Sequence, residues 1–433
     1  MNDSINVFWF RRDLRLTDNS GLYHALRSGK AVLPVFVFDT NILNELERND
    51  PRVSFIHNEL KGINETLNVF GSRLVVKYGD PLSVWKELVG EYHIAEVYTN
   101  RDYEPYALER DIQIRDFLHH QNIIFKSFKD QVIFETNEVA KEDGTQYTVY
   151  TPYMNKWMAR FADNPVQFHD SAGYFNHFLQ LSRTEIPALK EIGFVKSEIP
   201  APKIRIEKVL IDNYEQTRNY PFLNGTSLAG IHLRFGKVSI RELVRLADFS
   251  LNKTYLKELI WREFFMQILY HFPKVVRESF KPVYDKIIWN NNEDHFRLWC
   301  EGRTGYPMVD AGMRELNSTG FMHNRVRMVV ASFLCKHLLI DWRWGEAYFA
   351  EKLLDYELSS NNGNWQWAAG SGCDAVPYFR VFNPIEQQKK FDPNLNYIRK
   401  WIPELGTNVY PQPVIEHSFA RTRAIQTYKD ALH

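Results

Sequence analysis

The chain has 433 residues, more than one compact hydrophobic core normally supports, so we expect at least two domains. Its 53 Lys and Arg residues balance 53 Asp and Glu residues, which excludes a uniformly basic polyanion-binding protein but allows a local basic groove. The hydrophobic share of 44% indicates a globular protein, and the aromatic share of 15% is high enough to ask where the aromatic residues gather.

Short apolar runs alternate with amphipathic stretches in the first part of the chain. The apolar runs lie at residues 5–10, 31–38, 74–76 and 96–99. The stretches between them include residues 54–68 and 81–91. This alternation predicts βαβ units, and hence a Rossmann-like α/β domain with a parallel sheet over residues 1–132. No GxGxxG or P-loop motif follows any of these runs, so we expect no dinucleotide or triphosphate site there.

The rest of the chain divides into a connector and a helical part. Residues 133–205 hold scattered Pro, Asn and Gly with weak periodicity, which predicts an interdomain connector. Residues 206–433 predict an all-α domain, with helical apolar spacing at 238–246, 255–272, 309–316, 324–340 and 344–355. Eight of the eleven tryptophans lie in this part, so the aromatic excess gathers in the helical domain.

Cysteine usage and the N-terminus indicate the compartment. The three cysteines, Cys300, Cys335 and Cys373, lie far apart and form no CxxC pair, so we expect neither a metal site nor a disulfide framework. Free thiols suit a reducing cytoplasm. The opening residues MNDSINVFWF lack the basic and apolar regions of a signal peptide, and the apolar run at 329–340 is too short to span a bilayer. We therefore expect a cytoplasmic protein with no membrane partner.

Two helical segments place polar groups on one face. Glu258, Trp261 and Arg262 lie at i, i+3 and i+4, and spacing alone favours an ordinary intrahelical Glu258–Arg262 ion pair by about two to one. In the stretch FMHNRVRM, the side chains of Asn324, Arg327 and Met328 point in nearly one direction. His323, which precedes them, is interpreted as a hydrogen-bonded core histidine, because no second ligand stands at metal-binding spacing.

Two further segments are polar without being ordinary loops. Asp355 and Glu357 precede the stretch Asn-Asn-Gly-Asn-Trp-Gln-Trp at 361–367. Acids and amides can bind the edge of a heterocycle and indoles can stack on one, but the stretch could equally be a helix ended by Asn-Asn-Gly and followed by packing aromatics. The small residues of Gly225–Gly230 suit phosphate contact, although such clusters are usually plain loops.

Taken together, the motifs resemble those of the DNA photolyase/cryptochrome family, most closely its class I cyclobutane pyrimidine dimer photolyases. The segments that carry the resemblance are FRRDLRL at 10–16, GTS at 225–227, ELIWREF at 258–264, TGYPMVDA at 304–311, TGFMHNRVRM at 319–328, IDWR at 340–343, NNGNWQW at 361–367 and YFRVFNP at 378–384. The resemblance runs nearly end to end. It implies an α/β domain that can hold an antenna chromophore and an all-α domain that binds FAD.

The resemblance also implies the cofactor residues. In the family, the positions that bind FAD correspond here to Tyr214, Thr226, Ser227, Leu228, Ala229, Gly230, Tyr255, Arg262, Asn324, Arg327, Asp355, Glu357 and Asn361. Asn361 would face flavin N5, and Arg327 and Asp355 would pair beside the ring. Trp365, Trp342 and Trp289 would form the path that reduces the flavin in light. Gly230 stands where many relatives have a phosphate-binding serine.

A substrate pocket for ultraviolet-damaged DNA follows from the same resemblance. Its positions correspond here to Arg218, Glu258, Trp261, Arg262, Asn324, Arg325, Met328, Trp367 and Gln387. The catalytic set would be Glu258, Asn361 and the three tryptophans of the electron path. The implied activity is light-driven repair of cyclobutane pyrimidine dimers by a monomer, in which reduced FAD donates an electron to a dimer flipped out of the duplex.

Several alternatives stay open beside dimer repair. Repair of the (6-4) photoproduct is disfavoured because Asn324 and Met328 stand where such enzymes have histidines, and the DASH branch is disfavoured by Trp367. A cryptochrome-type photoreceptor and a flavin-free helical DNA-binding protein remain as alternatives. Asn100–Glu104 resembles a segment near which folate binds in some members, so the antenna could be a folate, a deazaflavin, a second flavin or absent.

Overall fold

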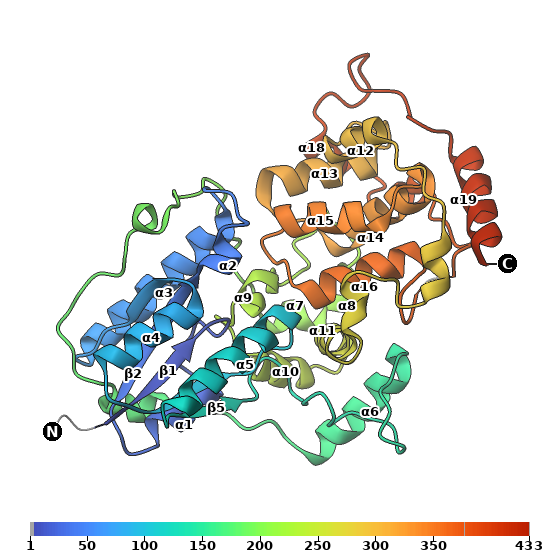
Figure 1. Ribbon diagram of the computed structural model, residues 1–433. Helices are drawn as coiled ribbons and strands as arrows, with labels where there is room; N and C mark the ends of the chain where they lie inside the picture. The colour runs from blue at the N-terminus through green and yellow to red at the C-terminus, as the bar shows by residue number, and fades with distance from the viewer. Residues whose placement is uncertain (1–3, 376, 433) are drawn as a thin grey trace. The chain divides into compact units, whose positions relative to one another are not determined.

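The chain folds into two compact units, as described by a computed structural model of residues 4–375 and 377–432 (Figure 1). The first unit comprises the residues up to Val139 together with Trp157–Pro202 and Ala229–Leu246. The second comprises Ala140–Lys156, Lys203–Leu228 and the residues from Ala247 onward. The segment expected as a connector therefore contributes residues to both units.

The first unit contains a five-stranded parallel sheet with strand order β3-β2-β1-β4-β5. The strands are β1 (Ile5–Phe10), β2 (Val32–Asp39), β3 (Val75–Gly79), β4 (Ile94–Asn100) and β5 (Ile124–Phe128). The predicted α/β fold with a parallel sheet is thus confirmed. The fifth strand was not predicted. It lies at the edge of the sheet, where Ile124 is exposed and the other residues are half-buried, and its sequence IFKSF is not an apolar run.

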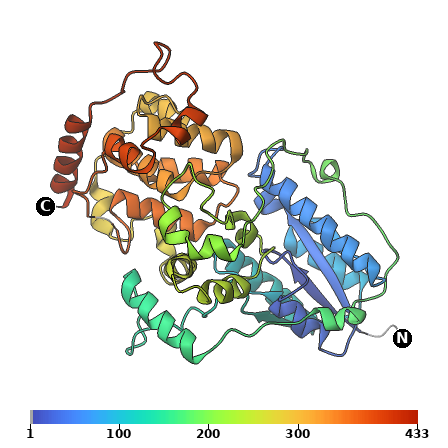
Figure 2. The ribbon, with the colours of Figure 1, turned by 180° about the vertical axis from the view of Figure 1, so that it is seen from behind.

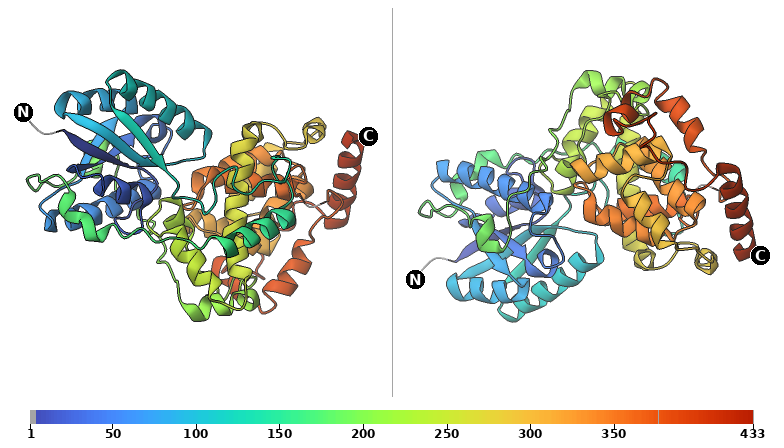
Figure 3. Two further views of the ribbon diagram at one scale, coloured as in Figure 1. Left: turned by 90° about the horizontal axis from the view of Figure 1, so that it is seen from below. Right: turned by 90° about the horizontal axis from the view of Figure 1, so that it is seen from above.

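Helices cover both faces of this sheet (Figures 2 and 3). Alternate residues of a strand point to opposite faces. Phe8 and Phe10 pack with α1 (Ser20–Leu26) and α3 (Pro51–Val69), whereas Val7 and Trp9 pack with α4 (Pro81–Glu91) and α5 (Pro105–His120). The other helical elements with residues in this unit are α2 (Thr40–Leu43), α6 (Tyr150–Asp163), η1 (Ala172–His177), η2 (Leu189–Ile192), α9 (Gly230–Arg234) and α10 (Ile240–Asp248).

The second unit is built from helices around an aromatic core that includes Trp299, Trp342 and Trp365. Its further elements are α7 (Lys208–Asp212), α8 (Tyr214–Thr217), α11 (Thr254–His271), η3 (Pro273–Val276), η4 (Pro282–Lys286), α12 (Glu293–Cys300), α13 (Pro307–Thr319), α14 (Asn324–Ser332), the π-helical turn η5 (Phe333–Leu338), α15 (Trp342–Lys352), α16 (Leu358–Ala369), α17 (Pro384–Phe391), α18 (Asn396–Trp401) and α19 (His417–Leu432). No helix within residues 4–375 or 377–432 has the length and hydropathy that a membrane span requires.

Helix α16 corrects one reading of the sequence. The Asn-Asn-Gly triplet does not end a helix but lies inside one, and the helix ends at Gly370, whose φ of 95° is left-handed. Gly363 is needed because a Cβ there would lie 2.5 Å from Phe265 Cε1 of the neighbouring α11. The amides of Asn362 and Gln366 both donate to Val275 O at 2.9 Å. These tertiary bonds compensate for the low helix propensity of Asn and Gly.

Candidate cofactor and substrate site

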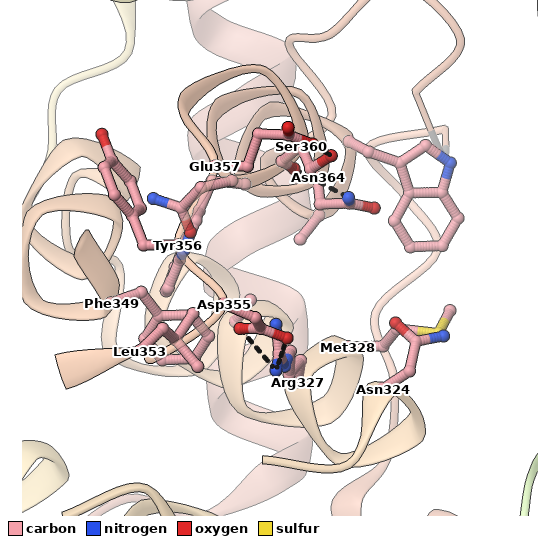
Figure 4. Close-up of a pocket in the computed structure, with 15 residues that line it drawn as sticks. Asn324, Arg327, Met328, Phe349, Leu353, Asp355, Tyr356, Glu357, Ser360 and Asn364 are labelled. Atoms are coloured by element: carbon pink, nitrogen blue, oxygen red, sulfur yellow. Dashed lines mark hydrogen bonds and ion pairs between the residues drawn. The ribbon is translucent and has the colours of Figure 1, made fainter. Parts of the chain in front are cut away.

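A cavity of about 90 Å³ in the second unit brings two of the sequence motifs together (Figure 4). One wall is the first turn of α14, with Asn324, Arg327 and Met328, and the other is α16 with the residues that precede it. The complete lining is Asn324, Arg327, Met328, Ala331, Phe349, Leu353, Asp355, Tyr356, Glu357, Ser360, Asn361, Asn364, Trp365, Trp367 and Ala368.

Arg327 and Asp355 form an ion pair at the wall of this cavity. Arg327 Nη2 lies 2.9 Å from Asp355 Oδ2 and 3.1 Å from Oδ1, as the dashed lines of Figure 4 mark. Arg327 Nε also donates to Met322 O at 2.7 Å. The guanidinium is therefore held from two directions, and Arg327 and Asp355 form the pair that was expected beside the cofactor.

Glu258 and Arg262 do not pair with each other, so the interpretation as an intrahelical ion pair is wrong. Arg262 Nη2 lies 3.2 Å from Glu357 Oε1, and these two side chains are only 12% and 6% exposed. Glu258 pairs with Arg218, which follows α8. A buried carboxylate such as Glu357 costs several kcal/mol unless it is paired, whereas an exposed i, i+4 pair gains only a few tenths. This difference directs Arg262 to Glu357.

The amide of Asn361 is oriented by Glu346 of α15. Asn361 Nδ2 donates to Glu346 O at 3.0 Å and to Glu346 Oε1 at 2.9 Å. Burial raises the pKa of the Glu346 carboxyl, and the hydrogen bond from Asn361 opposes that shift. With both N–H groups engaged, the side chain presents Oδ1, which has no hydrogen bond within the part of the chain that the structure describes, as an acceptor to the cavity.

The three tryptophans of the predicted electron path share one apolar cluster. Trp365 lines the cavity, and its ring neighbours are Phe349 at 5.0 Å and Trp299 at 6.2 Å between centroids. Trp365 and Trp342 are 2% and 1% exposed, whereas Trp289 is only partly buried. Trp365 and Trp342 are therefore both shielded from solvent, and Trp289 is the member of the three that is partly accessible to it. Their redox role stays a prediction.

Arg325, another of the predicted substrate positions, lies close enough to Arg218 for the two charges to interact. Arg325 Nη2 donates to Asn219 Oδ1 at 2.8 Å, and its guanidinium lies 4.4 Å from the Phe391 ring centroid. Within the described residues Arg325 Nε and Gln387 Oε1 are buried without a hydrogen-bond partner. Burial, followed by the charge of Arg218, lowers the pKa of Arg325. The unsatisfied Arg325 Nε–H, on a guanidinium that forms no ion pair within the described residues, fits a site that an anion such as a phosphate would complete.

The segment Gly225–Gly230, predicted to contact phosphates, is divided between the two units. Ser227 accepts a hydrogen bond from Tyr255 Oη at 2.9 Å, and the rings of Tyr255 and Tyr214 meet edge to face at 5.1 Å. Leu228 has a φ of 54°, which is unusual for a side chain of this size. Thr226, Ser227 and Leu228 belong to the second unit, whereas Ala229 and Gly230 belong to the first, where Gly230 begins the five-residue helix α9. Their phosphate contacts stay predictions.

Residues near the site that sequence reasoning missed are Glu346, Asn219 and Tyr150. Glu346 and Asn219 lie outside the motifs and are recognised only through their hydrogen bonds to Asn361 and Arg325. Tyr150 stacks on Trp261. A signal for Tyr150 did exist, because Tyr150, Tyr153 and Trp157 follow helical spacing.

The lining of the cavity suits a flavin ring. An acceptor at Asn361 Oδ1, the acid Glu357 and the Arg327–Asp355 pair are the groups that bind the donors and acceptors at the edge of such a heterocycle. Phe349 and Trp365 supply flat apolar surface at the same cavity. The residues present therefore fit FAD chemically.

Comparison with known proteins agrees with this chemistry. Residues 6–170 match the family model described as DNA photolyase, and residues 255–408 match the one described as FAD binding domain of DNA photolyase. The chain is 35% identical to a deoxyribodipyrimidine photo-lyase from Halobacterium salinarum, over 99% of each chain.

Comparison with solved structures also finds similarity to photolyases. A bacterial class III photolyase from Agrobacterium tumefaciens superposes with a TM-score of 0.89 at 32% identity, covering 100% of this chain and 98% of that one. An archaeal photolyase from Sulfolobus tokodaii with two FAD molecules superposes with a TM-score of 0.86 at 34% identity, covering 98% of this chain and 99% of that one. The chain therefore belongs to the DNA photolyase family, and its helical part is the FAD-binding domain of that family.

Proposed function

We propose that this protein is a deoxyribodipyrimidine photolyase that repairs cyclobutane pyrimidine dimers in ultraviolet-damaged DNA. The observation that carries the proposal is the convergence of α14 and α16 on one cavity, which places Asn324, Met328 and Trp367 beside the groups that suit a flavin. When bound, reduced FAD supplies the electron on absorbing blue or near-ultraviolet light. The protein contributes binding, orientation and exclusion of water.

The outer residues would hold the dimer. The Glu258 carboxylate, fixed by Arg218, is an acceptor for an N–H group of a dimer base. Trp261 and Trp367 are only partly buried and offer aromatic surface to a flipped lesion. Asn324 and Met328 complete the pocket with a polar and an adaptable apolar group, and neither can donate a proton as a histidine would. This pair supports dimers rather than (6-4) photoproducts as substrates.

The inner residues would keep the cofactor ready. Asn361 Oδ1, oriented by Glu346, would accept a hydrogen bond from the reduced flavin edge. Arg262 would neutralise Glu357 and so hold it as a fixed acceptor at the cavity. Trp289, Trp342 and Trp365 would pass electrons inward from the surface, which is supported by the partial exposure of Trp289 and the burial of the other two.

We further propose that the protein acts as a monomer in the cytoplasm. All the residues assigned above come from one chain, so no second copy is needed to complete the site. The cysteines Cys300, Cys335 and Cys373 are free thiols, which suits a reducing compartment. Arg218 and Arg325 would contact the phosphates of the DNA strand.

Illumination of a defined substrate tests the proposal. Protein with chemically reduced FAD and a duplex containing one thymine dimer are exposed to blue light, and the remaining dimer is quantified. We expect loss of the dimer in light, none in the dark, and none from a duplex carrying a (6-4) photoproduct. Trp344→Phe, a partly buried tryptophan outside the cavity, serves as the matched control for tryptophan variants. Selective binding of the dimer without its repair would instead indicate a photoreceptor.

A further inference from the structure

Tyr150, at the start of α6, stacks face to face on Trp261 within the second unit. The two ring centroids are 3.6 Å apart and the rings are inclined by only 8°. The other aromatic neighbours of Trp261 are Phe264 and Phe265, which meet it at 5.6 Å and 80° and at 5.4 Å and 31°. Tyr150 therefore covers one face of the indole, and a ligand can reach only what the three rings leave open.

Tyr150 is itself held at both ends. Its hydroxyl donates to Lys257 O at 2.6 Å, and its backbone N–H donates to Asp374 Oδ2 at 3.1 Å. Lys257 immediately precedes Glu258, and Trp261 follows one turn later on α11. A single side chain thus contacts the turn of helix that carries both residues assigned to dimer recognition.

The electrostatic surroundings keep Tyr150 neutral. Burial, followed by the nearby Glu258 carboxylate, raises the pKa of Tyr150, and Arg218 opposes this shift. The hydroxyl therefore keeps its proton and serves as the hydrogen-bond donor to Lys257 O.

We propose that Tyr150 is a positioning residue for dimer recognition: its ring fixes the Trp261 indole, while the hydrogen bond of its hydroxyl to Lys257 O helps to hold the Tyr150 ring in place. The inference rests on the proposed function. An indole held in its binding orientation loses less conformational entropy when a lesion packs against it, so the stack increases affinity for the dimer. It adds nothing to the photochemical step, because Tyr150 is not among the residues that line the flavin-type cavity.

Four variants and one probe test this role. The probe is a duplex with one thymine dimer, and the variants are Tyr150→Leu, Tyr150→Phe, Trp261→Ala and the double variant Tyr150→Leu/Trp261→Ala. Tyr150→Leu should raise the Kd for the dimer about threefold to tenfold, the value of an aromatic pair. Tyr150→Phe keeps the stack and should stay within about twofold of the parent. The repair rate of pre-reduced protein at saturating probe should not change in either.

The double variant separates positioning from general stability. If Tyr150 acts through Trp261, the double variant should bind no more weakly than Trp261→Ala alone. Phe296→Leu, which breaks the stack of Phe296 on Trp299 at 5.7 Å outside the site, is the matched control and should leave dimer affinity unchanged. Affinity for undamaged duplex should be constant throughout.

Distinct outcomes overturn the inference and the function. An unchanged Kd in Tyr150→Leu, or an additive loss in the double variant, overturns the positioning role while leaving dimer repair intact. If Tyr150→Leu does not fold, Tyr150→Phe decides, because a loss above about tenfold with the ring retained contradicts stacking as the source of affinity. A parent protein that does not distinguish damaged from undamaged duplex overturns both.

Discussion

Replacing Gly345 by alanine tests how tightly the proposed electron path is packed. Gly345 lies in α15 opposite the Trp365 indole, and a methyl group added there would lie 2.5 Å from both Leu334 Cδ2 and Trp365 Cζ3. Carbon atoms do not approach so closely, so a neighbour must move. Trp365 is 2% exposed and also packs against Phe349, so the indole has little space to move away from the added methyl group.

Two opposing effects set the expected magnitude. Alanine is more favourable than glycine inside a helix by about 1 kcal/mol. Overpacking a filled core costs about 1–3 kcal/mol, and two simultaneous short contacts place this position in the upper half of that range. We therefore expect Gly345→Ala to lower the free energy of unfolding by about 1–2 kcal/mol. The displaced indole should also slow flavin photoreduction.

A second glycine supplies the control. Gly62 lies within α3, and a methyl group there would meet nothing within 4 Å, so Gly62→Ala should stabilise the protein by up to about 1 kcal/mol. Urea unfolding of both variants, followed by the rate of flavin reduction in blue light with an external reductant, measures both effects. If Gly345→Ala is as stable as Gly62→Ala and photoreduces at the parent rate, the packing argument is refuted.

Three further outcomes are expected. His323 Nδ1 accepts from Arg325 N and caps α14, and burial lowers the pKa of His323 to about 4 from 6.5. Because the folded state keeps the neutral ring while the unfolded chain protonates, stability is full above pH 6.5 and is lost as the pH falls toward 4. His323→Asn, a cap that does not titrate, should reduce that loss by up to about 3 kcal/mol in urea unfolding, and an unchanged pH profile would contradict this. Arg325→Gln should lower the slope of log affinity against log salt for dimer DNA by about 1, measured by fluorescence anisotropy, and an equal slope would exclude a phosphate contact. Trp365→Phe should slow photoreduction but spare repair by pre-reduced protein, whereas Trp367→Ala should weaken dimer binding by about 1–3 kcal/mol and spare photoreduction. Similar losses in both assays for both variants would argue against separate roles.

The elements predicted best are those with the strongest hydrophobic pattern. β1, β2 and the helices α4 and α11 are within one or two residues of the predicted ranges. Every residue of β1 and β2 is buried, so each strand is a nearly continuous apolar run, whereas α4 and α11 show the apolar spacing of a helix. The segment 324–340 was predicted as one helix, but α14 ends at Ser332 and a π-helical turn follows, closed by the left-handed Leu339. Every residue of Phe333–Leu338 is buried, so hydrophobic periodicity carried no signal of the change.

The convergence of two motifs on one cavity could be predicted from the sequence, whereas the ion pairs within and around it could not. Motif residues from α14 and α16 were expected near one flavin, and they do line one cavity. Local spacing, however, reports only which side chains share a helix face. The partner of Glu258 is the residue after α8, and the partner of Arg262 is the residue before α16. That choice depends on which carboxylates become buried when the helices assemble. Burial of Glu357 is a property of the fold, so no local pattern could have shown it.

The back of α16 explains why a segment so rich in amides can be a helix at all. The side chains of Asn362 and Gln366 are buried and share the carbonyl of Val275, and Gln366 Oε1 accepts from Phe280 N. These bonds attach the rear face to neighbouring backbone and require their own residues to be polar. The front face is then free to be chosen for ligands rather than for stability.

That front face consists of two adjacent stripes, and the stripes divide its tasks. Asn361 and Trp365 are four residues apart, are buried, and lie on the inner stripe with the cavity wall. Asn364 and Trp367 are three residues apart and lie on the outer stripe, where Asn364 is exposed and Trp367 partly buried. A regular helix turns about 200° over two residues, so the two indoles need no irregular backbone to point in different directions. Moving either indole to position 366 would place it on the rear face, and moving Trp365 back or Trp367 forward by one residue would bring it toward the other stripe. The order Trp-Gln-Trp, and not merely the presence of two tryptophans, therefore fits one helix serving a buried cofactor and an incoming lesion.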